Sequence, residues 1–270
     1  MASTVYALLA ASGLPTIEAQ ALAAHALRLS RAVLLAEPER AVAGEEARRV
    51  ERLFLRRRAG EPVAYLTGER EFYGLSLKIT PDVLIPRPET ELLVDLALEL
   101  APEGARVLDL GTGSGAIAVA IAHEMPSADV WATDSSPAAL ALARDNARRH
   151  GVHLHCVESS WFAQLAGERF DVIVSNPPYV AEGDEHLEHG DLRYEPPAAL
   201  VGGADGLDCL RCIIAEAKVY LMPGGWLLLE HGYDQAERVR SLLGIYGYLD
   251  AQSLPDLAGI PRIAGARSPD

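Results

Sequence analysis

The chain lacks the marks of a membrane or secreted protein. No apolar run among its 270 residues reaches the roughly 18 residues that a membrane-spanning helix needs. The first segment, MASTVYALLAASGLP, has no positively charged flank, and Glu18 follows it closely, so it does not match a signal peptide. We therefore expect a cytoplasmic protein that does not bind membranes and whose first residues form a helix.

Cysteine is also scarce, which weighs against a disulfide framework. The three cysteines are Cys156, Cys209 and Cys212. The last two form a Cys-x-x-Cys pattern, which occurs in redox centres and zinc sites, but no second pair completes a zinc site. Because the surrounding stretch LDCLRCIIAEAKVYL is amphipathic, we predict that both are small core or boundary residues of a helix. We expect no bound metal.

Positive charge is in short supply. The formal net charge is −14, and residues 86–270 carry 13 Lys and Arg against 28 Asp and Glu. Such an acidic body argues against tight binding to phosphate backbones, so we expect no direct contact with nucleic acid. The most basic stretch is RRVERLFLRRR, residues 48–58. It fits a solvated helix face, with a docking surface for an acidic partner as the alternative.

Two periodicities divide the chain. Up to about residue 70, apolar residues recur every three or four positions, as in helices. FYGLSLKITPDVLIP then alternates around Gly74 and Pro81, which predicts a β-hairpin or paired extended segments. We therefore predict a helical domain over 1–70, a β-hairpin linker over 71–86 and a larger domain over 87–270.

In the larger domain, apolar runs alternate with helical segments. The runs are ARVLDL (105–110), ADVWAT (128–133), HLHCV (153–157), FDVIVS (170–175) and GWLLLEH (225–231). Runs without clean alternation, separated by helices, are typical of a parallel sheet that is covered on both faces. The sequence thus predicts a doubly wound, Rossmann-like α/β fold, whose ligands bind at the carboxyl ends of the strands.

A glycine loop and an acidic residue mark those ends. Gly111-Thr112-Gly113-Ser114-Gly115 follows the first strand, where glycines permit a tight turn and close approach of a ligand. Asp134 ends the second strand and is placed to accept from ribose hydroxyls of NAD or an adenosyl cofactor. It could instead cap the next helix, but Ser136 makes the better cap. Trp161 either covers a purine face or packs at the core edge.

The fourth strand ends in Asn176-Pro177-Pro178-Tyr179. The strand cannot continue, because proline has no N–H for the ladder. The Asn176 side-chain oxygen and the Pro177 carbonyl could accept from both N–H bonds of a planar NH2 group and stabilise the charge that develops as its nitrogen is alkylated. Tyr179 would supply an aromatic wall. A dehydrogenase, which the glycine loop alone would allow, needs an ionisable group that we do not find here.

Together with IPRPETE (85–91) and YEPPAAL (194–200), these motifs resemble the PrmC/HemK family of class I methyltransferases. The resemblance covers nearly the whole chain. It implies methyl transfer from S-adenosylmethionine, which becomes S-adenosylhomocysteine, to the side-chain amide nitrogen (N5) of the glutamine in the Gly-Gly-Gln motif of class-1 peptide chain release factors. It also implies that the helical N-terminal domain helps to recognise the release factor. We expect a monomer.

The resemblance implies roles for individual residues. The cofactor-binding residues would be Gly111, Thr112, Gly113, Ser114, Gly115, Asp134, Ser160, Trp161 and Asn176. The substrate would be bound by Asn176, Pro177, Pro178 and Tyr179, of which Asn176, Pro177 and Tyr179 form the catalytic group. The family commonly has Asp where this chain has Ser160, a weaker acceptor for the adenine amino group.

Some alternatives stay open. An adenine-N6 methyltransferase would use the same pocket for a flipped base, although the acidic body counts against it. A catalytically inactive, cofactor-binding scaffold is allowed by Ser160, although the complete glycine loop and Asn-Pro-Pro-Tyr motif count against it. Arg87, Glu89 and Glu91 could equally anchor the structure by ion pairs or act in the site.

Overall fold

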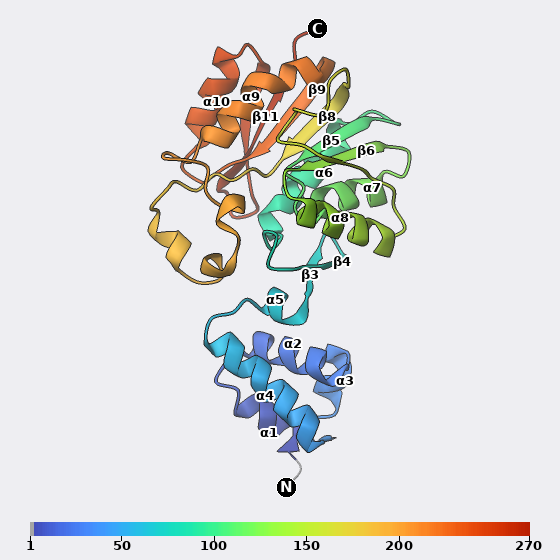
Figure 1. Ribbon diagram of the computed structural model, residues 1–270, viewed down its shortest axis with the longest axis vertical. Coiled ribbons are helices and arrows are strands. Elements are labelled where there is room, and N and C mark those ends of the chain that lie inside the picture. Colours follow the sequence, from blue (N-terminus) through green and yellow to red (C-terminus); the bar gives the residue numbers. More distant parts are fainter. Residues whose placement is uncertain (1–2) are drawn as a thin grey trace. The chain divides into compact units, whose positions relative to one another are not determined.

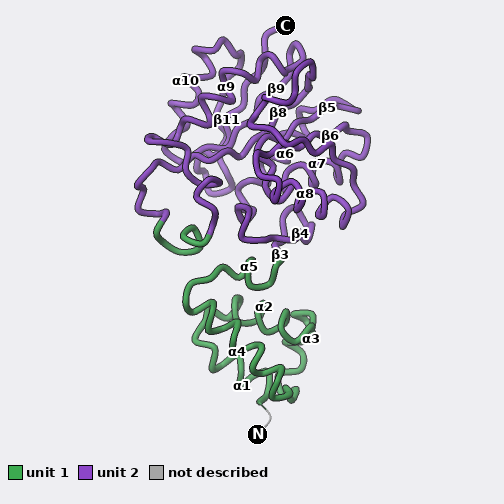
Figure 2. Tube along the Cα trace, in the orientation of Figure 1, with its two compact units in different colours: residues 1–69, 188–194 green, residues 70–187, 195–270 purple. Residues whose placement is uncertain are grey.

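The computed structural model describes residues 3–270, which form two compact units (Figures 1 and 2). Unit 1 comprises the residues up to Glu69 together with Glu188–Tyr194, and unit 2 comprises Arg70–Leu187 and Glu195–Asp270. The chain therefore crosses between the units three times, after residues 69, 187 and 194. The domain extents that we predicted from the sequence remain a prediction.

Unit 1 is helical, and two of its helices, α1 and α3, begin at a side chain that caps them. Its elements are β1 (Ser3–Thr4), α1 (Val5–Ala10), α2 (Thr16–Leu27), α3 (Arg31–Ala36), β2 (Ala41–Val42), α4 (Gly44–Arg58) and α5 (Val63–Thr67). The Thr4 hydroxyl accepts from Ala7 N at the start of α1, and the Ser30 hydroxyl accepts from Val33 N at the start of α3. Apolar residues such as Leu22, Val50 and Phe54 form a common core.

A segment from far along the chain completes unit 1. It contains η3 (Leu192–Tyr194) and ends a loop that includes η2 (Glu185–Glu188). Arg57 donates to both carboxylate oxygens of Glu18, at 2.7 and 2.8 Å, and to Asp191 Oδ1 at 2.8 Å. The Tyr194 hydroxyl donates to the Ala59 carbonyl at 2.8 Å. The hydrogen bonds that Arg57 donates to Glu18 and then to Asp191 outweigh partial burial and raise the pKa of Arg57, so this arginine is a structural residue of unit 1.

Unit 2 contains a seven-stranded sheet in the order β10-β11-β9-β8-β5-β6-β7. Its strands are β5 (Arg106–Leu110), β6 (Asp129–Asp134), β7 (His155–Glu158), β8 (Phe170–Ser175), β9 (Leu221–Glu230), β10 (Leu249–Pro255) and β11 (Pro261–Arg267). The five strands from β5 to β9 run parallel, and β10 and β11 add on antiparallel. This confirms the predicted doubly wound α/β fold. The order runs outward in both directions from the β5–β8 pair, so the strand order reverses there.

Helices cover both faces of this sheet (Figure 1). They are α6 (Glu91–Leu100), α7 (Ala116–Glu124), α8 (Pro137–Arg149), α9 (Asp208–Tyr220) and α10 (Ala236–Ile245). Contacts group α6, α7 and α8 together and α9 with α10. In β8, Ile173 packs with the α9 and α10 side chains, while Val172 and Val174, which point to the opposite face, are just as buried. Cys209 and Cys212 lie on α9, as predicted, with free, partly exposed thiols.

A hairpin follows unit 1 in the sequence, and all of it except Glu69 belongs to unit 2. Its strands are β3 (Glu69–Phe72) and β4 (Leu75–Lys78), which form a two-stranded sheet. Both turn residues, Tyr73 and Gly74, have positive φ, as a two-residue hairpin turn of type I′ requires. Buried Asn146 of α8 accepts from Lys78 N at 2.7 Å and donates to the carbonyls of Lys78 and Ser114. One side chain thus ties the hairpin to the glycine loop.

Between Ser3 and Asp270, no helix is both long and apolar enough to cross a membrane.

Gly115 lets two helices approach closely. It has φ +82°, and a Cβ at this position would come within 3.0 Å of the Cα and Cβ atoms of Ala143 in α8. Its φ lies in the left-handed region, which costs an L-residue about 1–2 kcal/mol. Gly115 therefore serves the packing of α7 on α8.

We predict that Gly115→Ala lowers the free energy of unfolding by roughly 2–4 kcal/mol, because backbone strain and overpacking add. Urea denaturation measures the change. Gly151→Ala is the matched control, since Gly151 also has positive φ (68°) but no atom within 4 Å of an added Cβ. Equal losses for the two variants would contradict the packing role of Gly115.

Candidate active site

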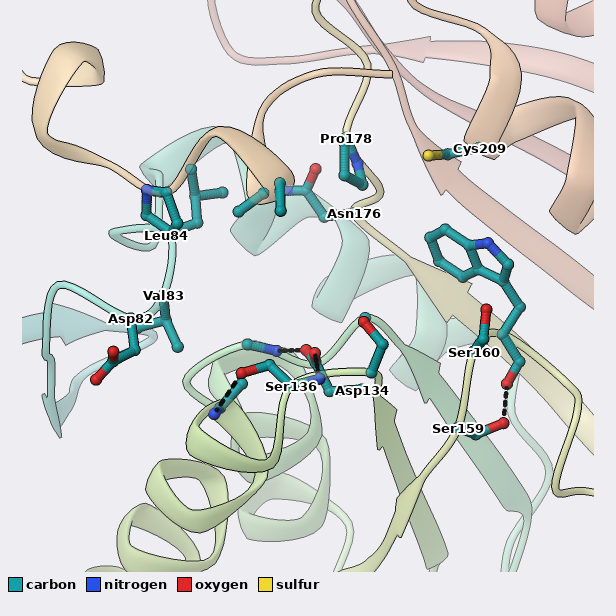
Figure 3. Close-up of a pocket in the computed structure, with 18 residues that line it drawn as sticks. Asp82, Val83, Leu84, Asp134, Ser136, Ser159, Ser160, Asn176, Pro178 and Cys209 are labelled. Atoms are coloured by element: carbon teal, nitrogen blue, oxygen red, sulfur yellow. Dashed lines mark hydrogen bonds between the residues drawn. The ribbon is translucent and has the colours of Figure 1, made fainter. Parts of the chain in front are cut away.

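A cavity of about 350 Å³ opens at the carboxyl ends of the parallel strands (Figure 3). It lies where the strand order reverses, which is the usual ligand site of open α/β sheets. Its volume is typical of small-molecule sites, which range over roughly 300–1,000 Å³. The lining residues are Asp82, Val83, Leu84, Gly111, Gly113, Asp134, Ser135, Ser136, Ala139, Ser159, Ser160, Trp161, Asn176, Pro178, Pro196, Ala198, Ala199 and Cys209.

Two glycines of the loop present bare backbone to this cavity. Gly113 has open space where a Cβ would stand, and the nearest atom to a Cβ on Gly111 would be a ring carbon of Trp161 at 3.7 Å. The other three loop residues do not line the cavity. Gly115 packs on α8, and the Thr112 hydroxyl donates to Asp109 Oδ2 at 2.7 Å. A cofactor-binding role of these three residues stays a prediction.

Asp109, which the sequence analysis gave no role, lies directly behind the glycine loop. It is fully buried, and its Oδ1 has no hydrogen-bond partner within residues 3–270. Burial raises the pKa of Asp109 to about 7, while the Thr112 hydroxyl and the Ala118 N–H act in the opposite direction. A buried oxygen without a partner marks a site that a further donor would complete.

Asp134 lines the cavity at the end of β6. Its Oδ2 accepts from Gly113 N at 2.9 Å, and its Oδ1 accepts from Ser136 N at 2.8 Å. Ser136 is the N-cap of α8, as predicted, because its hydroxyl accepts from Ala139 N. Two N–H groups therefore orient the carboxylate, and each oxygen retains acceptor capacity for a ligand.

Trp161 both packs on the core and lines the cavity. It is partly exposed, contacts the core around α9 and has φ +49°, a left-handed conformation that is uncommon for residues other than glycine. The Ser159 hydroxyl holds this turn by donating to the Trp161 carbonyl at 2.8 Å and accepting from Gln164 N at 3.1 Å. Ser160 is exposed beside the ring, and its hydroxyl has no partner in the described part of the chain.

Asn176 follows β8, and its side chain is oriented from outside the motif. Its Nδ2 donates to the Thr90 hydroxyl at 3.2 Å. Pro178 lines the cavity beside it, whereas Pro177 and Tyr179 do not. The Tyr179 ring packs against the core, and its hydroxyl donates to Glu230 Oε1 at 3.1 Å. The predicted aromatic wall is therefore not part of this cavity, and a role of Tyr179 in substrate binding stays a prediction.

The IPRPETE and YEPPAAL segments meet in an ion pair. Arg87 Nη2 lies 2.7 Å from both carboxylate oxygens of Glu195, whose side chain is 0% exposed. The next residue, Pro196, lines the cavity. Glu91 accepts from Tyr73 N at 2.8 Å, so it too has a structural partner, while Glu89 is exposed. For Arg87 and Glu91, the structure thus supports the anchoring alternative.

We predict that Arg87→Met destabilises the protein by about 3–5 kcal/mol, because it removes the charge partner of a buried carboxylate. Urea denaturation checks this value. The double variant Arg87→Met/Glu195→Met should recover much of the loss, since it leaves no buried charge behind. If the double variant is no more stable than the single one, the loss in Arg87→Met does not come from an unpaired Glu195 carboxylate.

Family models match most of the chain. The methyltransferase small domain matches residues 88–191, and the PrmC N-terminal domain matches residues 3–68. Among solved structures, a methyltransferase from Pyrococcus furiosus is similar with a TM-score of 0.57 at 19% identity, covering 80% of this chain and 98% of that chain. A Thermus thermophilus 16S rRNA N2 G1207 methyltransferase has a TM-score of 0.55 at 22% identity, covering 74% and 49%. These likenesses concern the fold.

Full-length relatives are much more similar in sequence. A release factor glutamine methyltransferase of Burkholderia pseudomallei is 52% identical, over 99% of this chain and 97% of the relative. One from Bordetella pertussis is also 52% identical, over 96% and 97%. A third, from Xylella fastidiosa, is 48% identical over 94% and 93%. With this identity over nearly its whole length, and with both domain models matched, the chain belongs to the family of release factor glutamine methyltransferases.

Proposed function

We infer that this protein transfers a methyl group from S-adenosylmethionine to the side-chain amide nitrogen (N5) of the glutamine in the Gly-Gly-Gln motif of class-1 peptide chain release factors. The observation that carries this proposal is Asn176, an oriented amide at the wall of a cavity that also holds a glycine loop and Asp134. The full-length relatives named release factor glutamine methyltransferases support the same substrate.

The cavity residues fit an adenosyl cofactor. Gly111 and Gly113 leave room for close approach of the ligand, and the acceptor capacity left on Asp134 suits two ribose hydroxyls. The Trp161 ring offers an apolar face for the adenine, and Ser160 would accept weakly from its amino group. When bound, S-adenosylmethionine supplies an electrophilic methyl group, and the proposed chemistry needs no metal.

The protein's own contribution is alignment and charge stabilisation. An amide nitrogen is a poor nucleophile, because its lone pair is delocalised. Asn176 Oδ1 and the Pro177 carbonyl would accept from its two N–H bonds, fix its plane and stabilise the positive charge that develops on it. The alkylated nitrogen loses a proton readily, so no strong base is required. Val180 N donates to Leu200 O at 2.9 Å, which anchors the end of the motif to the segment that follows the lining residue Ala199.

Mass spectrometry of the release factor tests this function. The purified protein is incubated with S-adenosylmethionine and a class-1 release factor, and the peptide that contains Gly-Gly-Gln is analysed. We expect one added methyl group, on the glutamine side chain. Duplex and single-stranded nucleic acids with adenine serve as competing acceptors in the same assay. Methylation of adenine without methylation of the glutamine would replace the proposal with the adenine-N6 alternative.

We predict that Asn176→Ala lowers the rate of transfer about 10²–10³-fold, because it removes a preorganised acceptor from the reacting nitrogen. The variant should keep the thermal midpoint of the parent, since the side chain makes one hydrogen bond to Thr90 and is partly exposed. Single-turnover kinetics provide the rate. A rate within tenfold of the parent would remove Asn176 from the mechanism.

Recognition of the whole release factor is a separate proposal, which rests on unit 1. In the basic stretch of α4, Arg56 pairs with Glu61 and Arg57 with Glu18. Arg48 and Arg52 are exposed and form no ion pair within the described residues. They flank a hollow of about 480 Å³ beside exposed Leu55. We propose that this face of α4 binds an acidic surface of the release factor, through Arg48 and Arg52 rather than the whole stretch.

We predict that Arg48→Glu/Arg52→Glu lowers kcat/KM for an intact release factor more than kcat, because charge reversal slows the encounter. The loss should shrink as salt rises. Methylation of a short Gly-Gly-Gln peptide should not change. Arg240→Glu, an exposed reversal on α10 of unit 2, is the control. An equal loss with Arg240→Glu would show that the effect is non-specific charge and not docking.

A further inference from the structure

A turn at one edge of the sheet in unit 2 presents apolar side chains to solvent. It joins β10 to β11 over residues 256–260. Among the large apolar side chains of residues 3–270, that of Leu257 is the most exposed, at 110%, and Ile260 is 38% exposed. Tyr233, in the loop that follows β9, is 65% exposed. We call these three residues the edge cluster.

Strand pairing puts the edge cluster on the edge of the sheet that holds the cavity. β9 is parallel to β8, β11 is antiparallel to β9, and β10 is antiparallel to β11. β10 therefore ends, and β11 begins, at the carboxyl edge. The pairing of β9 with β11 continues past Glu230, because His231 N donates to the Arg262 carbonyl at 2.9 Å. Tyr233 and Ile260, each two positions beyond that hydrogen bond, leave the same end of the pair.

This end of the strand pair is close to Asn176. The sheet order places β9 beside β8 and β11 beside β9. Neighbouring strands lie about 4.8 Å apart, so the ends of β8 and β11 are separated by roughly 10 Å. Asn176 follows β8 and lines the cavity. A protein interface of about 800 Å² per partner is much wider than this separation. A folded protein that placed a glutamine at Asn176 could therefore also cover the edge cluster.

Hydrogen bonds hold the turn in one shape, although it is exposed. Asp256 N donates to the Ile260 carbonyl at 2.8 Å, and Asp256 Oδ1 accepts from Ala258 N and Ile260 N at 2.9 and 3.0 Å. Arg262 Nε donates to Asp256 Oδ2 at 3.3 Å. These bonds fix the backbone on both sides of Leu257. A preorganised apolar group loses little conformational entropy when a partner covers it, so the turn is suited to binding.

We propose that the edge cluster is a docking surface for the class-1 release factor, which covers it with apolar residues that adjoin the Gly-Gly-Gln loop. This inference rests on the proposed function. Single exposed apolar residues are common, but three of them at the edge that carries the substrate cavity fit a binding surface. The contact is apolar, in contrast to the arginine face of α4, so the two surfaces respond differently to salt.

Kinetics with two substrates test the surface. Leu257→Ser should lower kcat/KM for an intact release factor about tenfold, as expected for the loss of one buried leucine contact, while kcat stays within about twofold. The loss should persist at high salt, because no charge is involved. Transfer to a short Gly-Gly-Gln peptide, which cannot span the distance to the turn, should not change. No loss with the intact release factor, in a parent that methylates it, would overturn the proposal.

Ile245→Ser is the matched control. Ile245 is 78% exposed and ends α10, which leads into the start of β10 and so lies at the opposite edge of the sheet. It should leave transfer to both substrates unchanged, and an equal loss in Ile245→Ser would also overturn the proposal. Both variants should keep the thermal midpoint of the parent, since both side chains are exposed.

Photo-crosslinking identifies what covers the turn. The photoreactive residue p-benzoylphenylalanine replaces Leu257, and the protein is irradiated with a purified class-1 release factor and S-adenosylhomocysteine. We expect cross-links to release-factor peptides that adjoin Gly-Gly-Gln, and none when the same residue replaces Ile245. Cross-links only to a second copy of this chain would overturn the proposal in favour of self-association.

Failure of the proposed function gives a different result. A parent protein that methylates neither the release factor nor the peptide would count against that function. The cross-links from position 257 still decide in that case whether the edge cluster binds a release factor.

Discussion

The abrupt end of β8 is the constraint on which the site depends. Two consecutive prolines have no N–H groups, so the ladder that pairs β8 with β5 and β9 cannot extend past Ser175. The chain must leave the sheet at its carboxyl edge, and Asn176 is the first residue to do so. The Asn176 amide is thereby placed at the same edge of the sheet as the glycine loop, which follows β5, and Asp134, which ends β6. The position of the site is therefore set by the point at which the prolines end the hydrogen-bonded ladder of β8.

Buried polar contacts then hold the segments around this point. The Arg87–Glu195 pair joins two loops that are far apart in the sequence, and Asn146 joins the hairpin to the glycine loop. Each contact restricts the motion of the segments it joins, because separating them would leave a buried polar group without a partner, which costs free energy. Rigid walls suit a reaction that depends on alignment more than on proton transfer. The need for rigid walls also accounts for the motif residues that contact protein and do not line the cavity, such as Thr112, Gly115 and Tyr179.

The fold was largely predictable from sequence, and the partners of the site residues were not. Period and spacing predicted the five parallel strands, because buried parallel strands are continuous apolar runs. They did not predict β10 and β11, which contain Pro255, Pro261 and Gly265 and which join the sheet only by antiparallel pairing with β9. Local pattern carries little information about such long-range pairing.

The site shows the same division. The position of Asp134 and Asn176 at the cavity could be predicted, because each lies at the end of a strand and carries a side chain suited to a ligand. Thr90 could not, since a threonine at the start of a helix resembles any capping residue until Asn176 is placed beside it. Gly115 belongs to the same glycine motif as Gly111 and Gly113, yet it packs against Ala143 and does not line the cavity. A motif specifies residue types, whereas the direction of each side chain depends on contacts from distant segments.

The discontinuous make-up of unit 1 has a consequence for synthesis on the ribosome. Its helices emerge before Asp191 and Tyr194, because the whole stretch 70–187 is translated in between. At elongation rates of roughly 5–20 residues per second, this delay is on the order of ten seconds, far longer than helices need to form. Glu18 lies within the first segment and can bind Arg57 at once. The nascent helices thus already have one partner for their partly buried arginine, and Asp191 is added to this existing ion pair later.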